Sequence, residues 1–328
     1  MFQRVTGGRA VAKAEVQSGS ESLPPLRSID IPRPRSDSAT GQCSDCQGVV
    51  SASILNCPDC GQFIGFPNVR AASSDAEAAA LTSHYEEVTE KLADAGLQQI
   101  GDEFEEAVAV DSKAVFCRTL SALLQVATSE DDLGVPYYKL IEAGLRKGYS
   151  DAISRLRPIV DEAFFPGYYQ NIRFAALTLD GSGPPSYGPC AVTIRSRLIA
   201  NRSSVFDGNT LVVLLQEDAR LSQLVTLPPG RRATWSNRGK LALCTFAGQL
   251  ESHPRSADFP QVLLQASRDA LTDQFIEVHI WGPITARAIE SVELPKPRDK
   301  GEQVYVRAIQ QALAEQGVRV VQSEAHRE

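Results

Sequence analysis

The sequence contains no apolar run of the roughly 18–20 residues that a membrane-spanning helix requires. Its first residues, MFQRVTGGRAVAKAEVQSGS, also lack the apolar segment of a secretory signal. We therefore expect a cytoplasmic protein with no membrane partner. Positive charge is not in excess either, since 33 Lys and Arg stand against 40 Asp and Glu and give a net charge of −7. This balance argues against a protein that coats nucleic acid through charge alone, although it allows a local basic patch.

Several motifs of well-known enzyme classes are missing from the sequence. It has no Walker P-loop, no Gly-x-Gly-x-x-Gly that follows a strand, no His-Glu-x-x-His and no Gly-x-Ser-x-Gly. Hydrolysis of nucleotides by a P-loop, Rossmann-type redox chemistry, zinc proteolysis and serine esterase chemistry therefore have no motif support.

Cysteine is scarce, with 7 residues in 328, yet four cysteines lie close together as two Cys-x-x-Cys pairs separated by ten residues: Cys43, Cys46, Cys57 and Cys60. Two such pairs can place four thiolates at about 2.3 Å from one zinc ion. A disulfide framework is typical of small secreted chains, and two redox dithiols would need a βαβ context that this region lacks. Four thiolates leave no open coordination position, so the pattern favours a structural zinc ion over a catalytic one.

Residues 43–66 resemble a zinc ribbon. The ten residues between the two pairs, QGVVSASILN, are rich in strand formers and predict a short hairpin. In the second pair, Pro58 favours a turn and Gly61 can adopt a positive φ after the last ligand. The first pair has Gln47 at a position where glycine is frequent.

The rest of the chain predicts an α+β protein of two or three domains. Residues 1–42, rich in Ser, Pro, Gly and Arg, read as a disordered arm. Residues 70–165 read as a helical region, because apolar side chains recur at helical spacing, first at Leu81, Tyr85, Val88 and Leu92 and later in DSKAVFCRTLSALLQVAT. Residues 166–328 hold short strand-like runs separated by Gly and Pro, and one helix that stops at Gly317. The predicted strands are IRFAALTLDG, YGPCAVTIRSRL, SSVFDGNTLVVLLQ, FIEVHIWG and VRVVQ.

The strand FIEVHIW, residues 275–281, carries the main candidate for chemistry. Alternation places Ile276, Val278 and Ile280 on one face. The other face holds Glu277 and His279 between two large aromatic residues, so we expect this face to be covered or to line a cleft. A carboxylate in this setting suits a cationic or oxocarbenium-like species, whereas a purely structural Glu277 would meet a nearby lysine or arginine.

Three segments resemble the ADP-ribosyltransferase superfamily, especially its bacterial toxin-type members. YGPCAVTIR is similar to a first core strand that follows a Tyr-Gly pair. RSSVFDGNT is similar to an Arg-small-Thr-Phe-Thr-x-Gly-Asp-Ser pattern. FIEVHIWGPITARAIESVEL is similar to the strand that bears the catalytic glutamate and its continuation.

This resemblance implies an ADP-ribosyltransferase-like domain over residues 166–328, with a split sheet and NAD bound in its cleft as substrate. Glu277 would be the catalytic residue that stabilises the positive charge developing on the ribose. The resemblance implies further contacts to NAD: Ser203 or Ser204 to the ribose, Arg195 or Arg202 to the diphosphate, and Tyr187 or Phe206 stacked on the nicotinamide.

Two functions follow from the sequence. The first is an NAD-dependent ADP-ribosyltransferase, a toxin or an antiviral defence effector, that modifies an unidentified macromolecular acceptor, either protein or nucleic acid. The second is a non-catalytic zinc-ribbon module that binds nucleic acid or protein. A basic segment around Trp235 with Arg231, Arg232, Arg238 and Lys240 is a candidate nucleic-acid contact for the second function, or else a solvated loop.

Overall fold

The computed structural model describes residues 40–128, 152–210, 212–213, 228–253, 255–267 and 272–323. All of them belong to one compact unit, residues 33–328. Most of the predicted arm over residues 1–42 lies outside the described residues. Its last three residues, Thr40–Gln42, form strand β1. In the described part of the chain, no helix is both long and apolar enough to cross a membrane.

One mixed eight-stranded sheet organises the fold, in the order β12-β11-β5-β3-β4-β10-β6-β7. All neighbours pair antiparallel except β11 and β12, which are parallel. Strand β3 pairs with β4 only over Lys113–Val115, and the split sheet expected from the resemblance stays a prediction. The strands are β3 (Lys113–Arg118), β4 (Ile172–Thr178), β5 (Cys190–Ile194), β6 (Ser203–Phe206), β7 (Arg232–Thr234), β10 (Glu277–Trp281), β11 (Ile289–Leu294) and β12 (Arg319–Gln322). A short pair, β8 (Leu264–Gln265) and β9 (Gln274–Phe275), forms a separate ladder.

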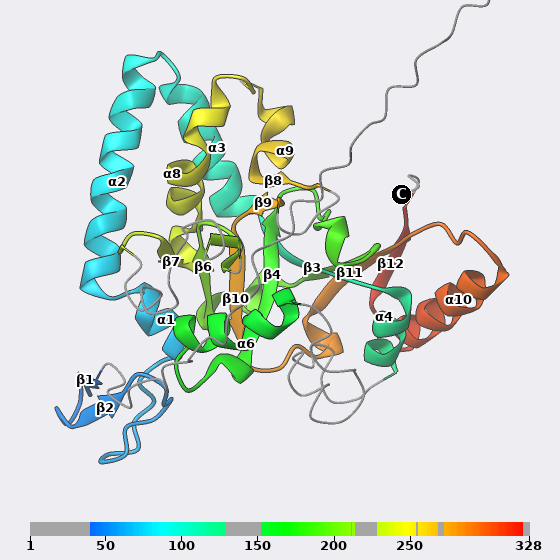
Figure 1. Ribbon diagram of the computed structural model, residues 1–328, viewed down its shortest axis with the longest axis horizontal. Helices are drawn as coiled ribbons and strands as arrows, with labels where there is room; N and C mark the ends of the chain where they lie inside the picture. The colour runs from blue at the N-terminus through cyan, green and yellow to red at the C-terminus, as the bar shows by residue number, and fades with distance from the viewer. Residues whose placement is uncertain are drawn as a thin grey trace, which may run out of the picture. The chain divides into compact units, whose positions relative to one another are not determined.

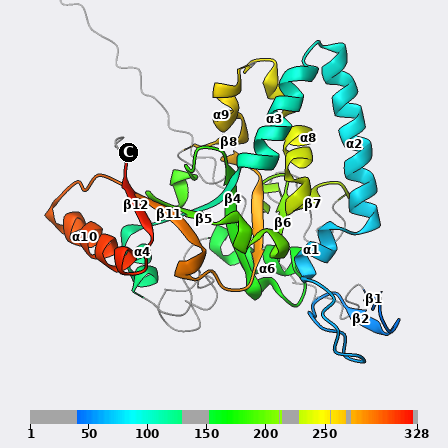
Figure 2. The ribbon, with the colours of Figure 1, turned by 180° about the vertical axis from the view of Figure 1, so that it is seen from behind.

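Helices cover one face of the sheet in two groups. Figures 1 and 2 show α2, α3 and α8 grouped above β6 and β7, α9 next to β8, and α4 with α10 beside β11 and β12. Both groups share one apolar core with Val278 and Ile280 of β10. The helix bounds are α1 (Pro67–Ala72), α2 (Asp75–Asp94), α3 (Gln98–Asp111), α4 (Leu120–Ala127), α6 (Ala152–Phe164), α8 (Arg238–Leu250), α9 (Phe259–Leu263) and α10 (Lys300–Glu315).

Two predicted helices are confirmed, and the second one ends where the sequence predicts. In α2, the Ser74 hydroxyl accepts a hydrogen bond from the Glu77 N–H and so caps the first turn. Leu81, Val88 and Leu92 of α2 are buried in the core, as their spacing predicts. Helix α10 ends just before Gly317, whose φ of +69° supplies the left-handed residue that commonly terminates a helix.

The prediction of a wholly helical region over residues 70–165 is wrong at β3. Residues 113–118 form a strand inside the sheet, between β5 and β4, and the helix of this segment begins only at Leu120. Four of the six β3 residues are buried, so the segment is apolar on both faces and lacks the alternation that identifies a strand. Thr119 separates the two elements, since its hydroxyl accepts from the Ala122 N–H and caps α4.

The later strands agree with the sequence in part. Four predicted strands contain β4, β5, β10 and β12, whereas β7 and β11 were not predicted. In SSVFDGNTLVVLLQ only Ser203–Phe206 is a strand, and Thr210 already has helical geometry. The described part of this run ends at residue 213, so the rest of the prediction lies outside the described residues.

The opposite face of the sheet carries the polar residues of β10 and an aromatic cluster. Phe164 and Phe165 at the end of α6 pack there with Phe206 of β6 and Trp281 of β10. This face therefore surrounds Glu277 and His279 with apolar rings, while Ile276, Val278 and Ile280 point into the main core. The alternation predicted for residues 275–281 is confirmed, and the polar face is covered.

Candidate functional site

Four cysteine sulfurs converge in the N-terminal part of the described chain. The Sγ atoms of Cys43 and Cys60 lie 3.7 Å apart, those of Cys46 and Cys57 lie 3.5 Å apart, and all four lie within 4.8 Å of one another. Sulfurs arranged tetrahedrally at about 2.3 Å from one ion are separated by about 3.8 Å. The cluster therefore fits a metal ion held by four thiolates and is compatible with structural zinc.

Each Cys-x-x-Cys pair sits at a tight turn. The second cysteine of each pair is followed by a residue in the left-handed region, Gln47 with φ +62° and Gly61 with φ +74°. Hydrogen bonds from the N–H groups of Cys46 and Asp45 lower the pKa of Cys43 to about 7, which favours its thiolate. Gln47 thus adopts the conformation that the usual glycine would take.

The hairpin differs from the prediction. Strand β2 (Val49–Ser51) pairs with β1, which precedes the first cysteine, instead of folding back within QGVVSASILN. The second pair is flanked in the same way, by a bridge between Asn56 and Phe63. Both cysteine pairs therefore lie at hairpin tips, because the turn at each pair is itself the hairpin connection.

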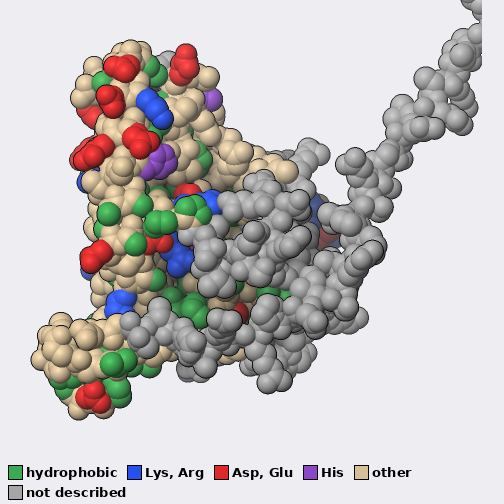
Figure 3. Space-filling model, turned by 60° about the vertical axis from the view of Figure 1, so that its left-hand side comes forward, with side chains coloured by type: hydrophobic (Ala, Val, Ile, Leu, Met, Phe, Trp, Pro, Cys, Tyr) green, Lys and Arg blue, Asp and Glu red, His purple; other side chains and the backbone are tan. Residues whose placement is uncertain are grey.

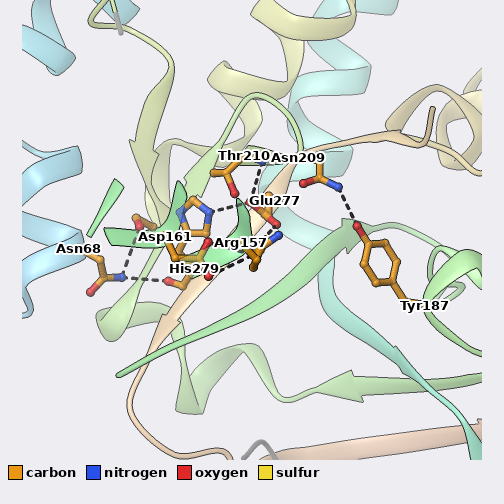
Figure 4. Close-up of polar contacts among 9 residues, drawn as sticks. Asn68, Arg157, Asp161, Tyr187, Asn209, Thr210, Glu277 and His279 are labelled. Carbon is orange, nitrogen blue, oxygen red and sulfur yellow. Dashed lines mark hydrogen bonds and ion pairs between the residues drawn. The ribbon is translucent and has the colours of Figure 1, made fainter. Parts of the chain in front are cut away.

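Glu277 lies at the start of β10, on the covered face of the sheet and 3% exposed. Its Oε2 accepts hydrogen bonds from the Thr210 backbone N–H and from Nε2 of His279, each at 3.1 Å (Figure 4). Its Oε1 lies 3.7 Å from the Arg157 guanidinium of α6. Arg157 also pairs with Asp161 one helical turn later, at 2.9 Å.

Electrostatics keep Glu277 ionised and His279 neutral. Burial alone would raise the pKa of Glu277, but the His279 hydrogen bond, the charge of Arg157 and the Thr210 N–H hold it below its ordinary value. Burial lowers the pKa of His279 more than the neighbouring carboxylate raises it. The neutral imidazole can then donate its Nε2–H to the carboxylate.

Aromatic rings enclose the imidazole. The ring centroids of Phe165, Phe174 and Phe206 lie 4.8, 5.5 and 6.2 Å from that of His279. Arg157 stacks over Phe174 with its guanidinium carbon 4.2 Å from the ring centroid. The polar pair is therefore surrounded by aromatic groups of low polarity, where neighbouring charges act strongly on one another.

The structure brings three of the predicted site residues together: Glu277, Phe206 and Tyr187. Phe206 is the register partner of Glu277 on β6. The Tyr187 hydroxyl accepts a 2.7 Å hydrogen bond from Nδ2 of Asn209, next to Thr210 (Figure 4). The Tyr187 side chain is 40% exposed, whereas burial of its hydroxyl, with a contribution from the charge of Glu277, raises its pKa to about 12. Tyr187 is thus the member of this group that lies at the surface.

Four other predicted residues contact different parts of the fold. Arg195 donates to the Ile289 carbonyl of β11, and Arg202 donates to the Trp281 carbonyl at the far end of β10. Ser203 donates to the Ile199 carbonyl. The Ser204 hydroxyl accepts from the Asn68 amide. None of these four contacts involves the Glu277 side chain, although Ser204 lies opposite His279 in the register of β6 and β10.

Sequence reasoning missed Arg157, Asn209, Thr210 and Asn68. Asn209 and Thr210 belong to RSSVFDGNT, a segment that carries the resemblance, but no role was predicted for either residue. Arg157 and Asn68 gave no local signal, because their roles depend on how α6 and α1 pack onto the sheet.

The basic segment around Trp235 is largely engaged within the fold, with Trp235 and Arg238 buried, Arg231 and Arg232 partly buried and Lys240 exposed. Trp235 is 6% and Arg238 7% exposed, and Arg238 donates hydrogen bonds to the Ser112 hydroxyl and the Trp235 carbonyl. Arg231 pairs with Asp207 at 2.8 Å, and Arg232 approaches Glu77 at 4.0 Å. Nearby, acidic side chains gather over α2 (Figure 3), where Glu86, Glu87 and Glu90 are exposed. These observations disfavour nucleic-acid binding through the basic segment.

The three segments that carry the family resemblance meet at one place. Tyr187 contacts Asn209 across 22 positions of sequence, and Thr210 contacts Glu277 across 67. Comparisons with protein-family models and with curated proteins find no match to this chain. The convergence of these segments is therefore the main observation on which a functional proposal can rest.

Proposed function

We propose that this protein is an NAD-dependent ADP-ribosyltransferase that modifies a macromolecular acceptor. The convergence of the three segments at Glu277 carries this proposal. Tyr187, the neighbours Asn209 and Thr210, and Glu277 come from three separate segments, and polar groups gathered at a buried carboxylate with a shifted pKa are typical of functional sites.

In the proposed reaction, the bond between nicotinamide and the ribose C1′ breaks, and nicotinamide leaves with the bonding electrons. Positive charge then develops on the ribose, and the Glu277 carboxylate stabilises it. The acceptor's nucleophile forms the new bond to C1′ and releases its proton. The Glu277 carboxylate is already ionised and held by its hydrogen bonds and by Arg157, so it needs little reorganisation during such a step, which makes it an effective stabiliser.

The other residues hold and orient Glu277. His279 and the Thr210 N–H fix Oε2 by hydrogen bonds, which leaves Oε1 as the oxygen turned to Arg157. Tyr187 offers an exposed ring for stacking on nicotinamide, so NAD would enter from this side. Arg195, Arg202 and Ser203 are left out of the proposed site because each binds a backbone carbonyl, and Ser204 is left out because its hydroxyl binds Asn68 and not Glu277.

A direct test uses the full-length protein with zinc and NAD labelled in its adenylate half, in the presence of a cell lysate. Released nicotinamide is measured by chromatography, and the label is then sought separately in protein, DNA and RNA. We expect nicotinamide release together with label in one of these classes. If nicotinamide release does not exceed that of the heat-denatured protein with any lysate, the proposal fails.

A second candidate function is a metal-containing binding module without catalysis. It is favoured by the ion pair between Glu277 and Arg157 inside a covered sheet face, which is the arrangement a structural glutamate would adopt. Phe63 and Val49 lie in the four-cysteine unit, residues 43–66. They are 52% and 64% exposed and would form part of the surface that contacts a partner. Zinc-dependent binding to a lysate component without nicotinamide release would identify this function.

A further inference from the structure

Helix α1 joins the four-cysteine unit, residues 43–66, to β10, the strand that carries Glu277. It follows the cysteine unit directly and consists of Pro67–Ala72 only. A helix this short is not stable by itself, so its position depends on what it contacts on both sides. One of its side chains contacts the cysteine unit and another contacts the sheet.

Arg70 faces the cysteine unit. Its guanidinium donates hydrogen bonds to the carbonyls of Ser51, Ala52 and Ile54, at 3.1, 2.7 and 3.0 Å. These carbonyls belong to the segment between the two cysteine pairs. They can remain in place only while that segment is folded, and in small units of this type the metal supplies the folding free energy.

Asn68 faces the sheet and is 2% exposed. Its Nδ2 lies 2.9 Å from the His279 carbonyl of β10, 3.1 Å from the Arg202 carbonyl and 3.3 Å from the Ser204 hydroxyl of β6 (Figure 4). Among the described residues its Oδ1 has no hydrogen-bond partner. The two N–H groups of this amide are shared among the three acceptors, so the single Asn68 side chain ties α1 to both β10 and β6.

Aromatic contacts follow the same route. Phe63 of the cysteine unit meets Phe66 with ring centroids 5.3 Å apart, and Phe66 meets Trp281 at 6.4 Å. Trp281 is the last residue of β10. The cysteine unit is thus joined to β10 at two points, at His279 through Asn68 and at Trp281 through Phe66.

We propose that metal binding at the four cysteines positions the His279–Glu277 pair through α1, with Asn68 as the positioning residue. The metal lies outside the site and takes no part in its chemistry. This inference rests on the proposed function only in treating β10 as the catalytic strand, because the coupling itself can be measured without NAD.

The test follows the His279 imidazole N–H by NMR in the full-length protein. The chain has four histidines, so the spectrum is simple, and a His279→Gln variant assigns the signal. In zinc-loaded protein we expect a slowly exchanging N–H, because it is buried and bonded to Glu277. After zinc is removed with a chelator, its hydrogen exchange should become about tenfold faster, which corresponds to the loss of about one hydrogen bond. Adding Zn²⁺ back should restore the slow rate.

Two variants and one control make the test specific. Asn68→Ala should accelerate the exchange in the zinc-loaded protein, whereas Asn201→Ala should not, because Asn201 is exposed. Arg70→Ala tests the same route from the cysteine side if Asn68→Ala fails to fold. Amides of α10, which packs at the other end of the sheet, should stay protected in every sample.

The outcome that overturns the coupling is an unchanged His279 exchange rate in metal-free protein whose residues 43–60 have lost amide protection. An absence of NAD turnover would leave the coupling intact, so the two proposals fail independently.

Discussion

Replacing Glu277 by glutamine removes one charge and almost no volume. If the glutamine oxygen takes the place of Oε2, it can still accept from the Thr210 N–H and from Nε2 of His279. Its amide group then faces Arg157, where Oε1 stood at 3.7 Å. The substitution therefore tests the charge of this residue and not its shape.

The expected loss of stability follows from these contacts. A hydrogen bond to a charged acceptor contributes about 1.5–3 kcal/mol, and one to a neutral acceptor about 0.5–1.5 kcal/mol. Two weakened bonds correspond to about 2–3 kcal/mol, which is partly offset because the buried charge no longer has to be desolvated. We expect a net loss of about 1–2 kcal/mol, or a decrease in Tm of about 2–8 °C.

The expected loss of catalysis is larger. If Glu277 stabilises charge that develops only in the transition state, kcat should fall about 10²–10³-fold while KM for NAD changes little. The assay measures nicotinamide release at saturating NAD, alongside the melting temperature. Full turnover in the variant would refute the catalytic role, and a rise in KM alone would reassign Glu277 to substrate binding.

Glu290→Gln is a matched control. Glu290 lies on β11 and pairs with Lys113 at 3.2 Å, with both side chains 35–40% exposed. An ion pair this exposed contributes about 0–1 kcal/mol, so the control should change Tm little and turnover not at all. A loss of turnover in the control equal to that in Glu277→Gln would show that the assay reports stability and not chemistry.

Two further predictions follow. We expect about one zinc ion per chain in freshly purified, reduced protein and almost none in a Cys57→Ser variant, and elemental analysis that finds no zinc in the native protein would contradict the four-cysteine site. We also expect stability to fall as the pH decreases below 6.5, the ordinary pKa of histidine, because the pKa of His279 is lowered on folding and the unfolded chain then binds more protons. The lowered pKa of Glu277 adds to this loss only below pH 4.5. Denaturant midpoints that stay constant between pH 7.5 and 5 would contradict the His279 shift.

The sequence predicted the clustering of the four cysteines and the two faces of β10 because both depend on local geometry. A Cys-x-x-Cys pair closes a tight turn that brings its two sulfurs together, and all four sulfurs do converge. Likewise, alternation alone sends Glu277 and His279 to the face opposite Val278. The ends of α2 and α10 were also predictable, because caps and a terminal glycine act over a single turn.

Tertiary packing decided the rest. Strand β3 was read as helix because burial on both faces removes the alternation, and only its place between β5 and β4 makes it a strand. The charge beside Glu277 comes from Arg157 on α6, and the predicted Arg195 and Arg202 bind carbonyls elsewhere. Which of several arginines meets a buried carboxylate depends on how distant elements pack, and that information lies in the sum of many weak contacts and in no single stretch of sequence.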